Sequence, residues 1–179
     1  ANLEGLDSIQ AGRFLSTSVV TSDGKADPSV AWFALEHNEG SVIGTAEEGL
    51  SWFDLEEINR FSPTPQVVVN QVFSDELEVG VGDEIQLGWF VRNQNGVERI
   101  EENFPIHQVV AMAGQGQLAG TTSPALFTDL LSAQGWQQSE GNVTSIRISL
   151  DGVEEKRSAV APVLDEIAQA LNESIGVSE

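Results

Sequence analysis

The first third of the chain has the pattern of β structure. Residues 14–21 are rich in β-branched and small side chains, and residues 29–35 carry valine, tryptophan and phenylalanine. Between them, residues 22–28 hold serine, glycine, proline and two aspartates, which are turn formers. The pattern therefore predicts two strands joined by a hairpin loop, with a further short strand over residues 41–45.

A short amphipathic helix is predicted over residues 50–61. Its apolar side chains at positions 52, 55 and 58 fall on one face, with acidic residues between them. Two prolines in the segment 62–65 then end the helix, because proline disfavours helical backbone in the residue before it. We take residues 62–65 as the best candidate for a boundary between two lobes.

The valine-rich segment 66–69 predicts a buried strand. Asn70 follows it and is a suitable cap for a short helix over residues 72–77, because its side chain can accept a hydrogen bond from the first helical turn. The glycines of segment 80–83 then turn the chain.

Residues 84–93 alternate apolar and polar side chains, as a half-buried strand does. The Asn95-Gly96 pair that follows is a strong hairpin signal, because both residues accept positive φ at low cost. We therefore expect a hairpin that ends near residue 104, followed by a separate strand over residues 106–112.

The glycine- and glutamine-rich segment 113–121 is predicted to be a loop. A helix is then expected over residues 123–131, with Ser123 as its cap, Pro124 at its first position and Gly135 as its end. A strand over residues 143–150 follows.

The last predicted element is a helix over residues 153–171, which Pro162 kinks or breaks. Helices and strands do not alternate steadily along the chain. The sequence therefore predicts an α+β fold, with a mixed α/β lobe and a smaller β-hairpin-rich lobe, rather than a doubly wound sheet.

Charge excludes some partners. The chain has 28 acidic and 8 basic residues in 179, a formal net charge of −20, which would repel nucleic acid and anionic lipid. Such a surface suits a salty medium or a basic partner, and we favour adaptation to the medium. The longest aliphatic run is three valines, far below the roughly 20 residues of a membrane helix, so we expect a water-soluble domain.

Candidate catalytic residues are few. The chain has no cysteine, so thiol catalysis and thiolate metal sites are excluded. His37 and His107 are its two histidines, and they lack the spacing of a metal site or a hydrolase base, so we interpret both as surface or edge residues. We therefore assign no catalytic, cofactor-binding or metal-binding residue.

Four further patterns have an ordinary structural interpretation. Acidic neighbours such as Glu56-Glu57, Glu101-Glu102 and Glu154-Glu155 do not face each other on one element. Asp23 and Asp27 lack the spacing of a calcium loop, and the glycines of segment 114–120 lack that of a phosphate-binding loop. The four tryptophans are favoured as core residues, with a ligand or partner surface as the alternative: Trp32, Trp52, Trp89 and Trp136.

From residue 67 onward, the order of segments resembles that of a known family. The resemblance rests on the strand Val67-Val68-Val69-Asn70, a short helix ending at Leu77, the stretch Val79-Gly80-Val81-Gly82-Asp83-Glu84-Ile85-Gln86-Leu87, and the strand Phe104-Pro105-Ile106-His107-Gln108-Val109-Val110-Ala111-Met112. This order is similar to the extracytoplasmic domain of MacB/FtsX-type ABC transporter permeases. Ala111 departs from the family, which has glycine there.

The resemblance implies one extracytoplasmic domain over residues 1–179, inserted between two transmembrane helices of a permease. Its mixed α/β lobe would comprise residues 1–62 plus 105–179, and its β-rich lobe residues 63–104. The implied domain is not an enzyme and has no cofactor. It couples ATP hydrolysis by a separate cytoplasmic subunit to an external partner.

The implied partners are the transmembrane part of the same permease and its ATPase subunit. An external protein, peptide or lipid is the candidate cargo, and a dimer is the candidate full-length form. The alternatives are a free extracellular acidic binding domain and an unrecognised carboxylate hydrolase. The permease hypothesis predicts chain ends that lie close together, and the hydrolase predicts a deep pocket with two acids of perturbed pKa.

Overall fold

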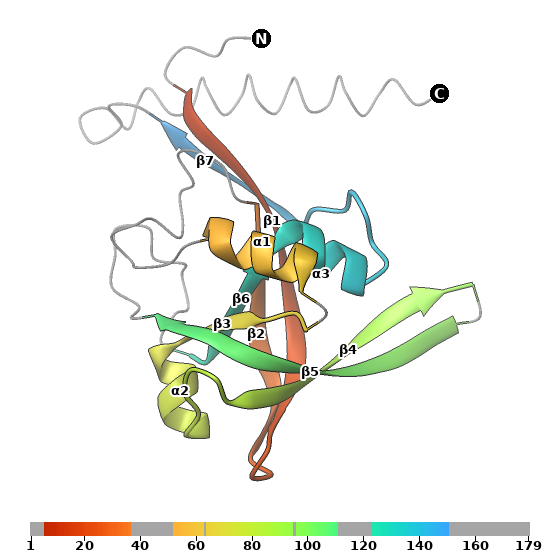
Figure 1. The fold of residues 1–179 in the computed structure, drawn as a ribbon. Coiled ribbons are helices and arrows are strands. Elements are labelled where there is room, and N and C mark those ends of the chain that lie inside the picture. Colours follow the sequence, from red (N-terminus) through yellow and green to blue (C-terminus); the bar gives the residue numbers. More distant parts are fainter. Residues whose placement is uncertain (1–5, 37–51, 63, 95, 111–122, 151–179) are drawn as a thin grey trace.

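The structure is a computed structural model that describes residues 6–36, 52–62, 64–94, 96–110 and 123–150. The described chain mixes helix and strand, as predicted, and strands predominate (Figure 1). In chain order the elements are β1 (Leu6–Thr21), β2 (Ala26–Leu35), α1 (Trp52–Phe61), β3 (Val67–Asn70), α2 (Gln71–Leu77), β4 (Glu84–Asn93), β5 (Gly96–Val110), β6 (Ala125–Asp129), α3 (Leu130–Trp136) and β7 (Ser145–Leu150).

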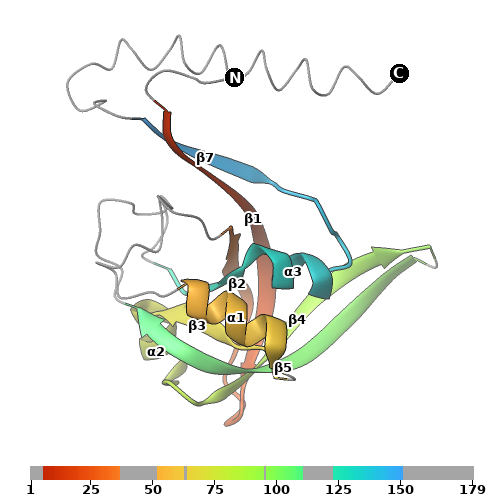
Figure 2. The same cartoon turned by 45° about the horizontal axis from the view of Figure 1, so that its top comes forward.

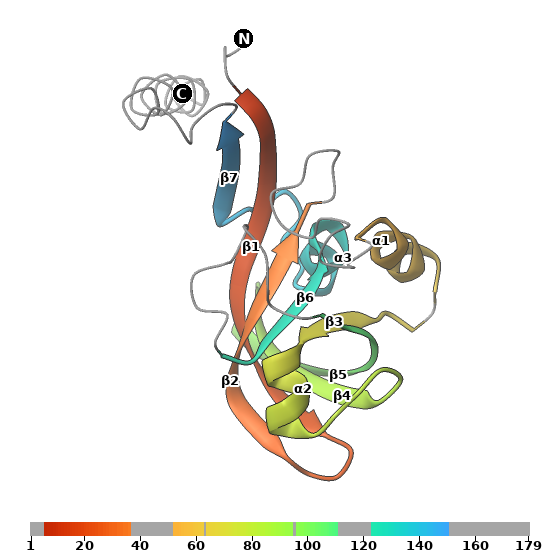
Figure 3. The same ribbon diagram turned by 90° about the vertical axis from the view of Figure 1, so that its left-hand side faces the viewer.

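Six of the strands close into a barrel (Figure 3). Their order is β2-β6-β3-β5-β4-β1, and β1 pairs back onto β2. The pairs β2–β6 and β3–β5 are parallel, whereas the other neighbours in the ring are antiparallel. Closure gives each of these strands a partner on both edges over part of its length, which removes the exposed edges of an open sheet.

The first strand, β1, has three strand partners. Residues 12–20 pair with β2 along one edge. On the other edge, residues 18–21 pair with β4 and residues 6–12 pair with β7. The β1–β7 pair extends beyond the barrel, as Figure 2 shows.

Aromatic side chains fill the barrel. The Trp32 ring is fully buried and lies 5.7 Å from the Trp89 ring between centroids, and its Nε1 donates to Thr128 Oγ1 at 2.8 Å. Phe104 is also fully buried, and its ring centroid lies 5.0 Å from that of Trp136 on α3. Helix α3 therefore closes the barrel interior from one side, and α1 packs beside α3.

A second, smaller cluster lies on the opposite face of the strands at β2, β3 and β6. It includes Phe33, Val68 and Phe127, with the Phe33 and Phe127 rings stacked at 5.5 Å between centroids. All five residues of β6 are buried, because one face packs into each cluster. A strand buried on both faces has a continuous apolar run instead of alternation.

This double burial explains one wrong prediction. The helix expected over residues 123–131 is β6 followed by α3, and the helix begins at Leu130. The Oδ1 atom of Asp129 caps α3 by accepting from the backbone N of Ser132 at 2.7 Å, so Ser123 is not the cap. Gly135, expected to end the helix, lies inside α3.

Several other predictions are confirmed. Helix α1 and strands β2, β3, β4 and β7 lie at or near the expected positions, and Asn70 caps α2 through a 2.9 Å hydrogen bond to the backbone N of Phe73. The β4–β5 hairpin is present, with Gly96 at φ 129°. Two strands differ from the prediction: β1 begins earlier, at Leu6, and the separate strand expected over residues 106–112 is wrong, because β5 continues unbroken through Pro105 to Val110.

Some predictions lie outside the described residues, namely the strand over 41–45, the loop over 113–121 and the helix over 153–171 with its kink at Pro162. The division into two lobes at residues 62–65 stays a prediction. In the described residues, β4 and β5 belong to the same closed sheet as β1, β2 and β6.

Candidate functional site

The candidate site lies where the outer edge of β1 has a gap between two partners. Strand β7 pairs with β1 as far as Gly12, and β4 pairs with it from Ser18 onward. Between them, residues 13–17 have no strand partner on this edge among the described residues. The gap opens because β4 diverges from β1 after Gly88.

Gly88 is the last residue of β4 that pairs with β1, and it lies opposite Ser18. A Cβ atom added at Gly88 would lie 2.5 Å from Ser18 Oγ, so a larger residue there would displace the Ser18 side chain. Beyond Gly88, β4 continues into the hairpin with β5, which projects away from β1 in Figure 1. The approach at Gly88 followed by divergence leaves an opening in the barrel wall.

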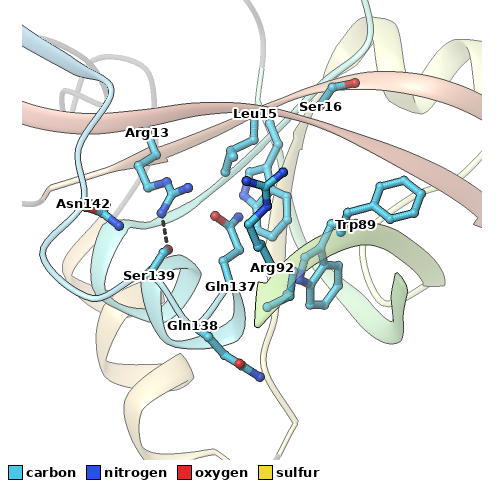
Figure 4. A pocket seen from close by; sticks show the side chains of 12 residues that line it. Arg13, Leu15, Ser16, Trp89, Arg92, Gln137, Gln138, Ser139 and Asn142 are labelled. Carbon is cyan, nitrogen blue, oxygen red and sulfur yellow. Dashed lines mark hydrogen bonds between the residues drawn. The ribbon is translucent and has the colours of Figure 1, made fainter. Parts of the chain in front are cut away.

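A pocket of about 430 Å³ occupies this opening (Figure 4). We name it the β1–β4 pocket. Its walls come from β1, β2, β4 and the segment that follows α3. The residues that line it are Arg13, Leu15, Ser16, Trp32, Trp89, Phe90, Val91, Arg92, Gln137, Gln138, Ser139 and Asn142.

The charge of the β1–β4 pocket is opposite to that of the chain. None of its lining residues is acidic, although 28 of the 179 residues are, and two of the 8 basic residues, Arg13 and Arg92, line it. Neither arginine forms an ion pair with a described residue. The pocket is therefore a locally cationic site on an anionic protein.

Arg13 is the more enclosed of the two arginines. Its Nη1 donates to Ser139 Oγ, and its Nε is buried without a hydrogen-bond partner among the described residues. Burial lowers the pKa of the Arg13 guanidinium from its ordinary value. An arginine nevertheless stays protonated at neutral pH, so the positive charge remains in the pocket wall.

Gln137 is the other polar group without a partner. Its side chain is only 8% exposed, and neither Nε2 nor Oε1 has a hydrogen-bond partner in the part of the chain that the structure describes. In Figure 4 its amide points into the pocket between Arg13 and Arg92. Trp89, which is 4% exposed, adds an indole N–H that also has no partner there. Buried polar groups in folded proteins are usually hydrogen-bonded, so this concentration of unpaired groups marks a site.

The tryptophans singled out in the sequence are core residues, as favoured. Trp32 and Trp89 are buried and Trp136 is partly buried, whereas the side chain of Trp52 lies outside the described residues. Trp32 and Trp89 also border the β1–β4 pocket, but Trp32 is fully buried, so of these two the alternative interpretation as a ligand surface is left to Trp89.

The histidines and acids singled out in the sequence lie elsewhere. His107 Nδ1 is 3.0 Å from Gln66 Oε1 on the neighbouring segment, and His37 lies outside the described residues. Glu101 pairs with Arg99 at 2.8 Å, and Glu102 is exposed beside it. Within the described ranges, no three His, Asp or Glu side chains cluster as a metal site would need.

The aspartates of the predicted hairpin loop support the turn itself. Asp23 Oδ1 accepts a hydrogen bond from Thr21 Oγ1, and this bond is the main reason that the pKa of Asp23 is lowered. Asp27 Oδ1 accepts from the backbone N of Ser29 at 2.9 Å. The segment is a hairpin turn, as predicted, with Gly24 at φ 88°.

Sequence reasoning missed the three residues that define the pocket. Arg13, Arg92 and Gln137 lie on β1, β4 and the end of α3, and no spacing links them. The one available signal was the rarity of arginine in so acidic a chain, with Arg13 directly before one predicted strand and Arg92 inside another.

Comparison with known proteins gives a match at the level of the fold. No family model and no curated protein matches the sequence. The periplasmic region of MacB from Actinobacillus actinomycetemcomitans is similar in structure, with a TM-score of 0.55 at 15% identity, over 95% of this chain and 69% of that one. The fold is that of a MacB-type extracytoplasmic domain.

A second structure of this kind has the same MacB-type fold. It is the extracellular domain of the noncanonic ABC-type transporter YknZ from Gram-positive bacteria, with a TM-score of 0.59 at 8% identity, over 99% of this chain and 81% of that one. The resemblance inferred from residues 67–112 is confirmed by both neighbours. The first of these neighbours is a periplasmic region and the second an extracellular domain. Among the helices of the described residues, none has the length and apolar character to span a bilayer.

Proposed function

We propose that this chain is the extracytoplasmic domain of an ABC transporter permease. It would transmit motion driven by cytoplasmic ATP hydrolysis to an external partner or cargo, and it would carry no catalytic centre of its own. The observation that supports this most directly is the MacB-type fold, which both neighbours use in ABC-type transporters. The transmembrane part of the permease and a separate ATPase are its expected partners.

The β1–β7 pair supports the same proposal. Leu6 and Leu150, the first and last residues of the described sheet, are paired in antiparallel strands. The described chain therefore enters and leaves the domain side by side (Figures 1 and 2). A domain inserted between two membrane segments needs this arrangement. The same expectation for Ala1 and Glu179 concerns residues outside the described ranges.

The length of β1 suggests how motion could travel. This single strand runs from the β7 pair, through the barrel wall, to the turn beyond Thr21. A displacement at its Leu6 end would therefore reach the far turn through one continuous hydrogen-bonded element. The carboxylate hydrolase gains no support from the β1–β4 pocket, because no acid lines it.

The placement outside the cytoplasm can be tested with single cysteines, because the chain has none. In the full-length gene product with other cysteines removed, Val97→Cys on the exposed hairpin should react in intact cells with a maleimide that cannot cross the cytoplasmic membrane. Val97 is 63% exposed and Val91 is 2% exposed, so Val91→Cys is the matched unreactive control. Labelling of the Val97→Cys variant only after lysis would contradict the placement.

The coupling proposal needs a separate measurement. Spin labels at Val97→Cys and Ser22→Cys would sit in the two predicted lobes, both on exposed residues. We expect their distance in the full transporter to change between the nucleotide-free and ATP-bound states. An unchanged distance would refute lobe motion and leave the extracytoplasmic placement intact.

A further inference from the structure

We propose that the β1–β4 pocket binds a ligand that carries a carboxylate next to an amide on an apolar side chain. N-acyl amino acids and the C-terminal residue of a peptide share this chemistry. The proposal concerns binding to the domain itself and does not depend on the transporter assignment. It follows from three properties of the pocket walls: unpaired cations, an unpaired amide and aromatic side chains.

The cations select the carboxylate. Arg13 and Arg92 line the pocket without ion pairs to described residues, and the rigid fork of a guanidinium matches a carboxylate with two parallel hydrogen bonds. The large negative charge of the chain does not cancel this attraction. Exposed charges are screened beyond about 8 Å at physiological ionic strength, and no acid lines the pocket.

The unpaired amide of Gln137 selects an amide in the ligand. A primary amide offers one donor group and one acceptor, and both are buried and unpaired among the described residues. A second amide satisfies both at once, in either orientation of the Gln137 side chain. The stretch of β1 without a strand partner on this edge lies in the same wall, and although the backbone N of Phe14 there already donates to Thr144 Oγ1, a short extended backbone could also bind at Ser16.

The aromatic wall selects the apolar side chain. Leu15, Trp89 and the exposed Phe90 supply the apolar lining, and the fully buried Trp32 lies edge to face with Trp89 at 5.7 Å between centroids. The volume of about 430 Å³ lies within the range of small-molecule sites, which runs from about 300 to 1,000 Å³. One hydrophobic residue with its terminal carboxylate and its amide has the size and polarity that this wall requires.

The test titrates the purified chain with N-acetyl-L-phenylalanine. Tryptophan emission is a direct readout, because the chain has no tyrosine and two of its four tryptophans line the pocket. Calorimetry gives the affinity independently. We expect saturable binding, weakened about tenfold or more when the carboxylate is replaced by a carboxamide, since a charged hydrogen bond contributes roughly that factor. N-acetylglycine, which lacks the apolar group, should also bind more weakly.

Two variants test the assigned residues. Arg92→Gln should weaken N-acetyl-L-phenylalanine about tenfold, and Arg92 is exposed, so the fold should be retained. Arg99→Gln is the matched control on the same hairpin, because Arg99 pairs with Glu101 and does not line the pocket. Gln137→Leu should weaken the acetylated amino acid but leave phenylpropionate, which has no amide, unaffected.

The proposal is overturned by three results. These are the absence of saturable binding at millimolar ligand, equal binding of the carboxylate and the carboxamide, or an equal effect of Arg92→Gln and Arg99→Gln. A tetrapeptide ending in phenylalanine separates the two sources of the chemistry. Tighter binding of the peptide assigns the site to chain ends along the β1 edge, and equal binding assigns it to the terminal residue alone.

Discussion

Two buried polar regions of this domain differ in how their hydrogen bonds are used. At the junction of β3, α2 and β6, the fully buried side chain of Asn70 accepts from the backbone N of Phe73 at 2.9 Å and of Ala125 at 3.1 Å, and donates to the carbonyl of Ser123 at 2.9 Å. In the β1–β4 pocket, the amide of Gln137 is almost as buried and has no partner among the described residues.

The difference distinguishes a buried polar group that stabilises the fold from one that is available to bind a ligand. A buried amide with all its partners holds chain segments together, and losing it leaves several backbone groups unsatisfied. A buried amide without partners loses its hydrogen bonds to water on folding and gains no hydrogen bond in the protein, so it destabilises the fold. Asn70 therefore supports the fold, whereas Gln137 is explained by what the pocket can bind. This comparison predicts that polar-to-apolar substitutions at Asn70 and at Gln137 change the free energy of unfolding in opposite directions.

The largest effect is expected for Asn70→Leu. It removes the cap of α2 and leaves the backbone groups of Phe73, Ala125 and Ser123 unpaired, which should lower the free energy of unfolding by about 3 kcal/mol or more. Urea denaturation measures this. Gln71→Ala, at the exposed next position, is the control and should change stability by less than about 0.5 kcal/mol. Similar losses for both variants would contradict the structural role of Asn70.

Trp32→Phe should have the next largest effect, because Trp32 is a residue of the pocket lining whose polar atom is hydrogen-bonded, as that of Asn70 is. It lines the pocket, yet its Nε1 is paired with the fully buried Thr128. Phenylalanine leaves that hydroxyl unpaired and should cost about 2 kcal/mol in unfolding free energy. If the hydrogen bond is the cause, adding Thr128→Val should cost less in the Trp32→Phe variant than in the native chain. Strictly additive losses would assign the effect to packing alone.

A smaller effect, with the opposite sign, is expected for Gln137→Leu. Replacing an unpaired buried amide by an apolar group of similar size should leave stability unchanged or raise it by about 1 kcal/mol. Gln134 is the matched control on α3, because it is similarly buried but its Nε2 donates to the carbonyl of Asn142 at 2.8 Å. Gln134→Leu should lower the free energy of unfolding by about 1 kcal/mol. Thermal melting of both variants is the measurement, and equal losses of stability for Gln137→Leu and Gln134→Leu would contradict the comparison.

The smallest effect is expected for Asp23→Asn, in an exposed turn where solvent competes with the hydrogen bond. The pKa of Asp23 is lowered in the fold, chiefly by the hydrogen bond from Thr21, so its ionised form contributes stability at neutral pH. That contribution is lost as pH falls below the ordinary carboxyl range of about 4. The melting temperatures of the native chain and Asp23→Asn should therefore differ slightly at pH 7 and converge in acid. A gap that widens in acid would contradict this sign.

Local signals in the sequence predicted most of the fold. The cap at Asn70 fixes the start of α2 through the chemistry of a few adjacent residues, and the Asn95-Gly96 pair predicted the β4–β5 hairpin, in which Gly96 is the first residue of β5, opposite Asn93. The error at residues 123–131 has a physical cause. The apolar positions of β6 and α3 together imitate one helical stripe, and double burial of β6 removes the alternation that marks a strand. Such burial depends on distant segments, which local patterns do not report.

For the same reason, local sequence patterns could not predict the candidate site. Arg13, Arg92 and Gln137 come together only because β4 leaves β1 at Gly88 and the chain after α3 returns beside them. The sequence did indicate that Trp32 and Trp89 were either core or ligand-facing. In the structure both are core residues that border the pocket, with Trp32 fully buried and Trp89 4% exposed.

The three partners of β1 also determine when the sheet can be completed during protein synthesis. β1 is synthesised first among the described elements. The hydrogen bonds along its outer edge can form only after β4 and then β7 have been synthesised, and Leu150 of β7 pairs with Leu6. Contacts so distant in sequence form late, because loop closure costs entropy before the contact repays it. A chain truncated before β7 would leave residues 6–12 without that partner. An unpaired strand edge of this kind is a template for aggregation.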